Sequence, residues 1–65
     1  MMSEKLTLRQ WRLAREISID KMAELLGIHP NTYRQWEAEP DQIAIGRAQQ
    51  ISEILRVPLA DIFLP

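Results

Sequence analysis

The chain of 65 residues has no cysteine and only two glycines. It can therefore form no disulfide, which is typical of proteins in the reducing cytosol. No stretch approaches the roughly 20 apolar residues that span a bilayer. The first residues, MMSEKLTLRQ, also lack the apolar core of a secretory signal. We therefore expect a cytoplasmic protein with no membrane segment. We expect residues 1–65 to form a single domain, near the lower size limit for folding without disulfides or metal.

An excess of positive charge is missing as well. The formal net charge is −1 and the pI is ≈ 5.7, whereas nucleic-acid-binding domains are usually basic. The charges are nevertheless unevenly placed. Residues 1–36 carry six basic and four acidic side chains, while residues 37–65 carry two basic and five acidic ones. The basic surplus of the first part favours DNA binding weakly, and a solvated helix face explains it nearly as well.

The residue sets that enzymes need are also absent. The sequence has no nucleophile–base pair and no glycine-rich phosphate loop. His29 is the single histidine, and no carboxylate at ligand spacing accompanies it. We therefore expect no enzymatic activity, no metal and no cofactor.

Local signals predict two helices in the first part of the chain. Residues 1–6 are expected to form a frayed lead. Thr7 and Gln10 have the spacing of a capping box at the start of the first helix. Ser18 can cap a second helix, which Gly27 would end as a left-handed residue.

The second part of the chain continues the helical pattern. Pro30 suits the first position of a third helix, with His29 as its cap. Residues 38–42 are rich in turn formers, a fourth helix is expected over about residues 45–55, and a last turn or helix over 57–64. The sequence therefore predicts an all-α fold, a compact bundle of four or five short helices.

The stretch SIDKMAELLGIHPNTYRQWE, residues 18–37, indicates function most clearly. Ala23 is small enough for two helices to cross closely, and Gly27 permits a sharp turn between them. Apolar residues at helical spacing supply the inner faces of both helices: Met22, Leu26, Ile28, Tyr33 and Trp36. This arrangement is a helix-turn-helix, which presents its second helix to a DNA groove.

The aromatic side chains allow a second interpretation. Trp11 and Trp36 could stack on the bases of single-stranded nucleic acid. Their inward spacing favours core packing far more strongly. We expect Tyr33 to pack in the same way, with its hydroxyl reaching the surface.

Nearly the whole chain resembles the lambda-repressor-like, Cro/Xre-type helix-turn-helix family of phage and bacterial regulators. Five segments over roughly residues 6–64 carry the resemblance: LTLRQWRLARE, SIDKMAELLGI, HPNTYRQWE, IAIGRAQQISEIL and VPLADIFL. The resemblance implies a sequence-specific, double-stranded-DNA-binding transcriptional regulator, such as a small phage repressor or Cro-like protein. It also implies a structural salt bridge between Arg12 and Glu37, joining the first and third helices.

Candidate base-reading residues lie on the third helix. At about 100° per residue, Asn31, Arg34 and Gln35 share its outer face, opposite the aromatic residues. Asn and Gln can bond the adenine edge in two places, and Arg the guanine edge. The resemblance makes Pro30, Asn31, Thr32 and Gln35 the groove-facing set and leaves Arg34 between a base and a phosphate role. Three polar residues on one helix face can also be merely solvated.

Phosphate contacts are expected mainly around the start of the second helix. The candidates are Ser18, Ile19, Lys21, His29 and Arg34, with Arg9 and Arg15 ranked behind them. Ile19 can contribute only its backbone N–H, as can its neighbour Asp20. So few basic groups predict a shallow dependence of DNA affinity on salt.

Departures from the family pattern weaken the DNA interpretation. Ile19 stands where the family often has a phosphate-contacting Gln, and Glu16 stands where it favours Gly. Residues 38–40, Ala-Glu-Pro, replace the usual polar residue, Gly and often Lys. Glu39 and Asp41 would also lie near the DNA backbone in family-like docking. These features favour an alternative, a protein-interaction module on the same fold, such as an antitoxin-like partner, anti-repressor or adaptor.

A single small domain makes few base contacts, so useful specificity calls for a partner copy. We expect a homodimer on a pseudo-palindromic operator. Apolar residues around Pro40–Arg47 and Leu59–Leu64 mark the expected dimer surface. A monomer that dimerises only on DNA fits the sequence equally well.

Overall fold

The computed structural model describes residues 5–63. Its elements are α1 (Leu8–Ala14), α2 (Ile19–Leu26), α3 (Pro30–Ala38), the 3-10 turn η1 (Pro40–Gln42), α4 (Ile45–Leu55) and α5 (Leu59–Phe63). Five α-helices and no strand in this range confirm the predicted all-α bundle. Residues 1–4 of the expected lead, and residue 64 at the end of the last expected segment, lie outside the described residues. No helix within residues 5–63 is long and apolar enough to cross a membrane.

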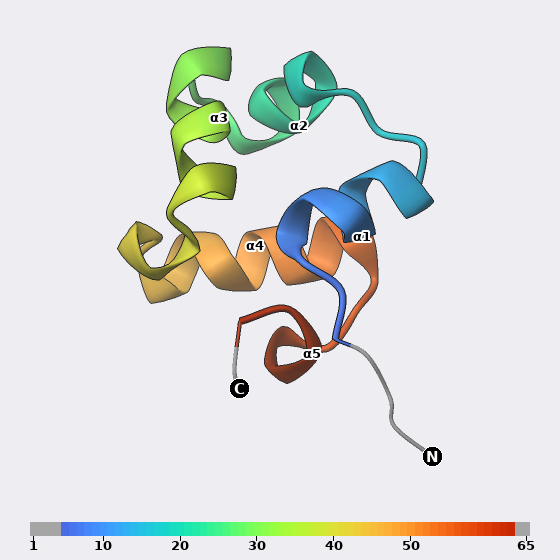
Figure 1. The fold of residues 1–65 in the computed structure, drawn as a ribbon. Helices are drawn as coiled ribbons and strands as arrows, with labels where there is room; N and C mark the ends of the chain where they lie inside the picture. Colours follow the sequence, from blue (N-terminus) through green and yellow to red (C-terminus); the bar gives the residue numbers. More distant parts are fainter. Residues whose placement is uncertain (1–4, 64–65) are drawn as a thin grey trace.

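The helices stack in two groups around α4. Figure 1 shows α2 and α3 together on one side of α4, with α5 on the other side. Contacts join α2 to α3 and to α4, and α5 to both α4 and α1. The helix-turn-helix pair α2–α3 therefore packs on α4 through α2, and the ends of the described chain lie away from this pair.

The predicted helix starts are present. Gln10 donates its backbone N–H to Thr7 Oγ1 at 3.1 Å, and Thr7 donates its own to Gln10 Oε1 at 2.8 Å. Ser18 Oγ accepts the backbone N–H of Lys21 at 3.0 Å at the start of α2. Each bond satisfies an amide that has no partner within its own helix, which typically contributes about 1 kcal/mol.

Three helices end in the same left-handed turn, but only one of them uses glycine. Glu16 (φ 56°), Gly27 (φ 69°) and Arg56 (φ 58°) follow α1, α2 and α4. After each, the next N–H donates to the carbonyl five residues back, at 3.0 to 3.2 Å. A side chain with a Cβ pays roughly 1–2 kcal/mol in this conformation. Glu16 and Arg56 are therefore strained positions that glycine would relieve.

Arginines from other helices cover two of these ends. Arg47 of α4 donates to the carbonyl of Leu26, the last residue of α2, at 2.6 Å. Arg15 Nε donates to the carbonyl of Leu55, the last residue of α4, at 2.7 Å, with its guanidinium 5.7 Å from the Trp11 ring centroid. A cation at a helix C-terminus satisfies a free carbonyl and opposes the negative end of the helix dipole. Arg15, ranked among the lesser phosphate candidates, thus has a structural contact.

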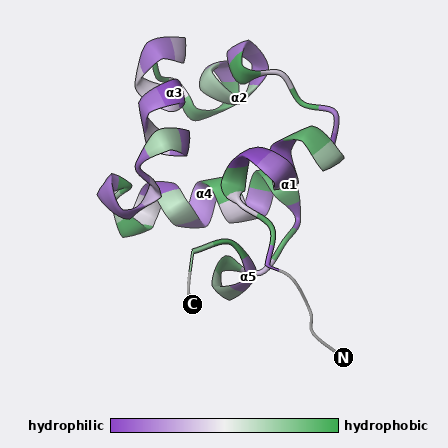
Figure 2. Ribbon diagram, in the orientation of Figure 1, coloured by the Kyte–Doolittle hydropathy of each residue, from purple (hydrophilic) through white to green (hydrophobic). Residues whose placement is uncertain are grey.

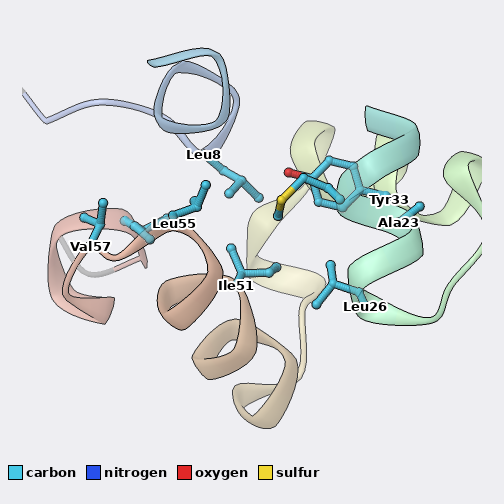
Figure 3. Close-up of a cluster of buried hydrophobic side chains, with 9 residues drawn as sticks. Leu8, Ala23, Leu26, Tyr33, Ile51, Leu55 and Val57 are labelled. Atoms are coloured by element: carbon cyan, nitrogen blue, oxygen red, sulfur yellow. The ribbon is translucent and has the colours of Figure 1, made fainter. Parts of the chain in front are cut away.

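One apolar core joins the helices. Figure 3 shows Ile51 pointing from α4 into the space between Leu8, Leu55 and Leu26. The buried members of this core are Leu8, Met22, Ala23, Leu26, Tyr33, Ile51, Leu55, Val57 and Ile62. Trp11 and Trp36 are half-buried and pack against it, as their spacing predicts. Full burial of such a side chain contributes roughly 1.5–3 kcal/mol, so this cluster is the main source of stability.

Candidate nucleic-acid interface

The turn between α2 and α3 depends on two small residues for different reasons. Ala23 is 1 % exposed, and Figure 3 shows it beside Tyr33, where the two helices meet. A larger side chain there would push the helices apart. A Cβ at Gly27 would instead meet nothing within 4 Å. Gly27 is therefore required for its positive φ and not for close packing.

The two faces of α3 differ as the sequence predicts. Tyr33 is fully buried, Trp36 is half-buried, and Glu37 lies on the same inner side. Figure 2 shows hydrophilic residues along most of the helix. The exposed polar side chains on its outer side are Asn31, Thr32, Arg34 and Gln35, with half-buried Pro30 at the first position. All the predicted base-reading residues except half-buried Pro30 are therefore exposed on α3.

An ion pair fixes the orientation of α3. Arg12 Nε lies 2.6 Å from Glu37 Oε2, and Arg12 Nη2 donates to Glu37 Oε1 at 3.3 Å. The two side chains are only 6 % and 8 % exposed. Arg12 Nη1 also donates to the carbonyl of Ile17 at 2.8 Å, so the same guanidinium holds the link between α1 and α2. The pair that the family resemblance implies is present, and its hydrogen bond raises the pKa of Arg12.

Tyr33 brings a buried hydroxyl close to this pair. Burial, and next the Glu37 carboxylate, raises the pKa of the Tyr33 phenol above its ordinary value of 10.0. Its oxygen is buried and has no hydrogen-bond partner among the described residues. The expectation that this hydroxyl reaches the surface is wrong. The ring lies in the core beside Ala23 of α2, and its hydroxyl is near enough to Glu37 and Arg12 for both to act on its pKa.

The start of α2 carries the expected phosphate candidates. Ser18 and Lys21 are exposed, and Lys21 Nζ lies 3.7 Å from Glu24 Oε1, a surface pair that contributes little. Ile19 is half-buried against the core, which explains an apolar residue where the family often has Gln. Its backbone N–H has no acceptor among the described residues and remains available at the positive end of the helix.

His29 caps α3. Its Nδ1 accepts the backbone N–H of Asn31 at 3.0 Å, the role that a Ser or Asp oxygen usually fills. The residue is exposed at the same end of α3 as the candidate base-reading residues. Of its two expected roles, the structure contains the cap, and a phosphate contact stays a prediction.

Two side-chain contacts were not predicted from the sequence. Arg34 Nη1 donates to Asn31 Oδ1 at 2.7 Å on the outer face of α3. The segment after α3, expected only as a turn, forms the 3-10 turn η1, where Gln42 donates to Glu39 Oε2 at 3.0 Å. The i, i+3 spacing of both pairs is a signal that could have suggested them.

Comparison with known proteins agrees with this geometry. A helix-turn-helix family model matches residues 8–62, which run from the start of α1 into α5. Neither curated proteins nor solved structures give a significant match. The family match covers most of the chain and coincides with the observed helices. The chain therefore belongs to the lambda-repressor-like, Xre-type helix-turn-helix family, whose members are DNA-binding regulators and typically not enzymes.

Proposed function

We propose that residues 1–65 act in the cytoplasm as one sequence-specific transcriptional regulator of the small phage repressor or Cro-like kind. In this proposal α3 lies in the major groove of double-stranded DNA. The observation that carries it is the two-sided character of α3. Its inner face is held by buried Tyr33 and by the Glu37 ion pair, while exposed amide and guanidinium groups line the outer face. A rigid helix with such an outer face suits direct readout of base edges.

Each outer residue takes a role that its chemistry permits. Gln35 can accept from adenine N6 and donate to N7, and Arg34 can donate to both guanine acceptors. Asn31, Thr32 and Pro30 lie close enough to the start of α3 to contact neighbouring bases. The phosphates on either side of these bases would then be bound by Ser18, Lys21, His29 and the backbone of Ile19.

The number of phosphate contacts should be small. Three arginines outside α3 are already bound to protein groups: Arg12 to Glu37 and Ile17, Arg15 to Leu55, and Arg47 to Leu26. Exposed Glu39 and Asp41 add negative charge after α3. Since each phosphate contact adds about 0.9 to the slope of log K against log salt, we expect a shallow slope.

A groove next to η1 supports a homodimer. This open groove, of ≈ 620 Å³, is lined by Leu6, Ile43, Ile45 and Phe63, among others. Ile45 is 67 % exposed, unusual for an isoleucine. Lys5 and Asp41 also line the groove and carry opposite charges, which suits a self-complementary two-fold interface. Pairing of two copies here would present two α3 helices to a pseudo-palindromic operator.

The dimer is tested by light scattering with and without DNA. Ile45→Lys should shift the protein to monomer without unfolding it, because the side chain is already exposed. Leu13→Lys is the matched control, since Leu13 is 53 % exposed on α1 and does not line the groove. A dimer that resists Ile45→Lys would place the interface elsewhere. A protein that is monomeric alone and dimeric on DNA would support the DNA-induced form.

A protein-interaction module remains the second candidate. It is favoured by the acidic residues after α3 and by Ile19. The Ile19 side chain packs against the core and has no polar group that could bind phosphate. Selection of binding sites from random duplex DNA at two salt concentrations separates the two candidates. A palindromic consensus whose affinity falls with salt supports the regulator. Failure to enrich any sequence would favour the protein partner.

A further inference from the structure

The outer face of α3 carries one ordered side-chain pair. Arg34 Nη1 donates to Asn31 Oδ1 at 2.7 Å, and both residues are exposed. An arginine has only donors, so the amide of Asn31 must turn its oxygen toward Arg34 and its NH2 away. The two side chains thus have a defined relative orientation.

The orientation changes what this surface offers to a base. The Asn31 oxygen, its single acceptor atom, is engaged beside a positive charge. The Asn31 oxygen can still accept at its second lone pair, but the other free groups, the Asn31 NH2 and the unused guanidinium N–H groups, are all donors. Adenine and cytosine present an exocyclic NH2 donor in the major groove, which these donors would oppose. Guanine presents N7 and O6, two acceptors, which they match.

No carboxylate competes for this guanidinium. Among the described residues the ion pairs are Arg12 with Glu37 and Lys21 with Glu24. Arg34 therefore donates one of its five N–H groups to Asn31, and the other four have no acceptor among the described residues. Fixing the side chain before binding also lowers the entropy that is lost when it docks.

We propose that Asn31 and Arg34 form one guanine-reading unit, in which Arg34 contacts the base and Asn31 positions it. This inference rests on the proposed DNA-binding function. The sequence leaves open whether Arg34 contacts a base or a phosphate, and this proposal assigns it to a base. It also assigns Asn31 a positioning role in place of independent adenine readout.

The test compares sites selected from random duplex DNA by the wild-type protein, Asn31→Ala, Arg34→Ala and the double variant. Arg34→Ala should weaken the preference for guanine at one base pair by about tenfold or more. Asn31→Ala should weaken the same position, and the double variant should lose no more than Arg34→Ala alone, because the two residues act together. Gln35→Ala is the control and should change a different base pair. All three substituted residues are exposed, so the circular dichroism spectrum of every variant should match that of the wild type.

The salt dependence separates a base contact from a phosphate contact. If Arg34 reads a base, Arg34→Ala leaves the salt slope nearly unchanged and weakens only sites that contain the guanine. A slope lowered by about 0.9, with equal weakening of all sequences, would overturn the inference and assign Arg34 to phosphate. Loss of an adenine preference in Asn31→Ala, with the guanine preference intact, would overturn it as well. Failure of the wild-type protein to select any site would instead refute the proposed function, and the guanine reading with it.

Discussion

The two faces of α3 are built in opposite ways. On the inner face Glu37 makes two contacts with Arg12, and Tyr33 is fully buried. On the outer face, within residues 5–63, the structure contains one side-chain hydrogen bond, which joins Asn31 to Arg34. Changes on the inner face therefore act on the fold, whereas changes on the outer face leave packing untouched. The fold and the proposed specificity should be separable by mutation.

The largest effect is expected at the inner face. Arg12→Ala or Glu37→Ala leaves one buried charge without its partner, which typically costs about 3–5 kcal/mol. A domain of this size has little more stability than that to lose. Thermal melting followed by circular dichroism should show a largely unfolded protein for both variants.

A surface pair supplies the control for this experiment. Glu24→Ala removes the exposed partner of Lys21, and the melting temperature should barely change. If Arg12→Ala and Glu37→Ala both melt at the wild-type temperature, the ion pair does not stabilise the inner face of α3.

The next largest effect is expected at the outer face. Gln35→Ala should lose about 1–3 kcal/mol of discrimination at one base pair, because it removes a two-point contact with a base. Its unfolding transition should match that of the wild type, since Gln35 is exposed. An unchanged consensus in selected sites would remove Gln35 from the reading face.

Alkaline pH offers a test of the inner face alone. The folded state raises the pKa of Tyr33 above 10.0, so above that pH the unfolded chain releases a proton that the folded chain keeps. The free energy of unfolding should then fall as pH rises past 10.0, by up to about 1.4 kcal/mol per pH unit. Urea titrations at several alkaline pH values should show this loss, and Tyr33→Phe should reduce it. An equal loss in both proteins would assign the effect to other groups.

The smallest effect is expected at two positions outside α3, where neither face of that helix is changed. Glu16→Gly and Arg56→Gly should each raise the free energy of unfolding by roughly 1 kcal/mol, because glycine adopts the left-handed conformation without a Cβ clash. Glu16→Ala and Arg56→Ala are the matched controls and should give no such gain. Both glycine variants should bind DNA as the wild type does.

Local signals in the sequence predict most of the scaffold. The capping box at Thr7, the Ser18 cap and the left-handed Gly27 are set by residues within a few positions, so spacing alone reveals them. The helical period likewise separates Tyr33 from the exposed residues of α3. The Arg12–Glu37 pair spans 25 positions and was foreseen only through the family resemblance.

Two of the contacts that escaped prediction depend on tertiary placement. Arg47 reaches Leu26 across 21 positions, and Arg15 reaches Leu55 across 40. No local period links such residues, since their approach follows from how the helices pack. The buried hydroxyl of Tyr33 was missed for the same reason, because its depth depends on a neighbouring helix.

We propose that the outer face of α3 reads DNA while its inner face stabilises the fold. The most direct test measures the affinity of the variant Asn31→Ala/Arg34→Ala/Gln35→Ala for a site selected by the wild-type protein, together with its thermal melting. This variant should melt at the same temperature as the wild type, and its affinity for the selected site should fall to that for random duplex DNA. Undiminished affinity for the selected site, in a protein that melts normally, would contradict it.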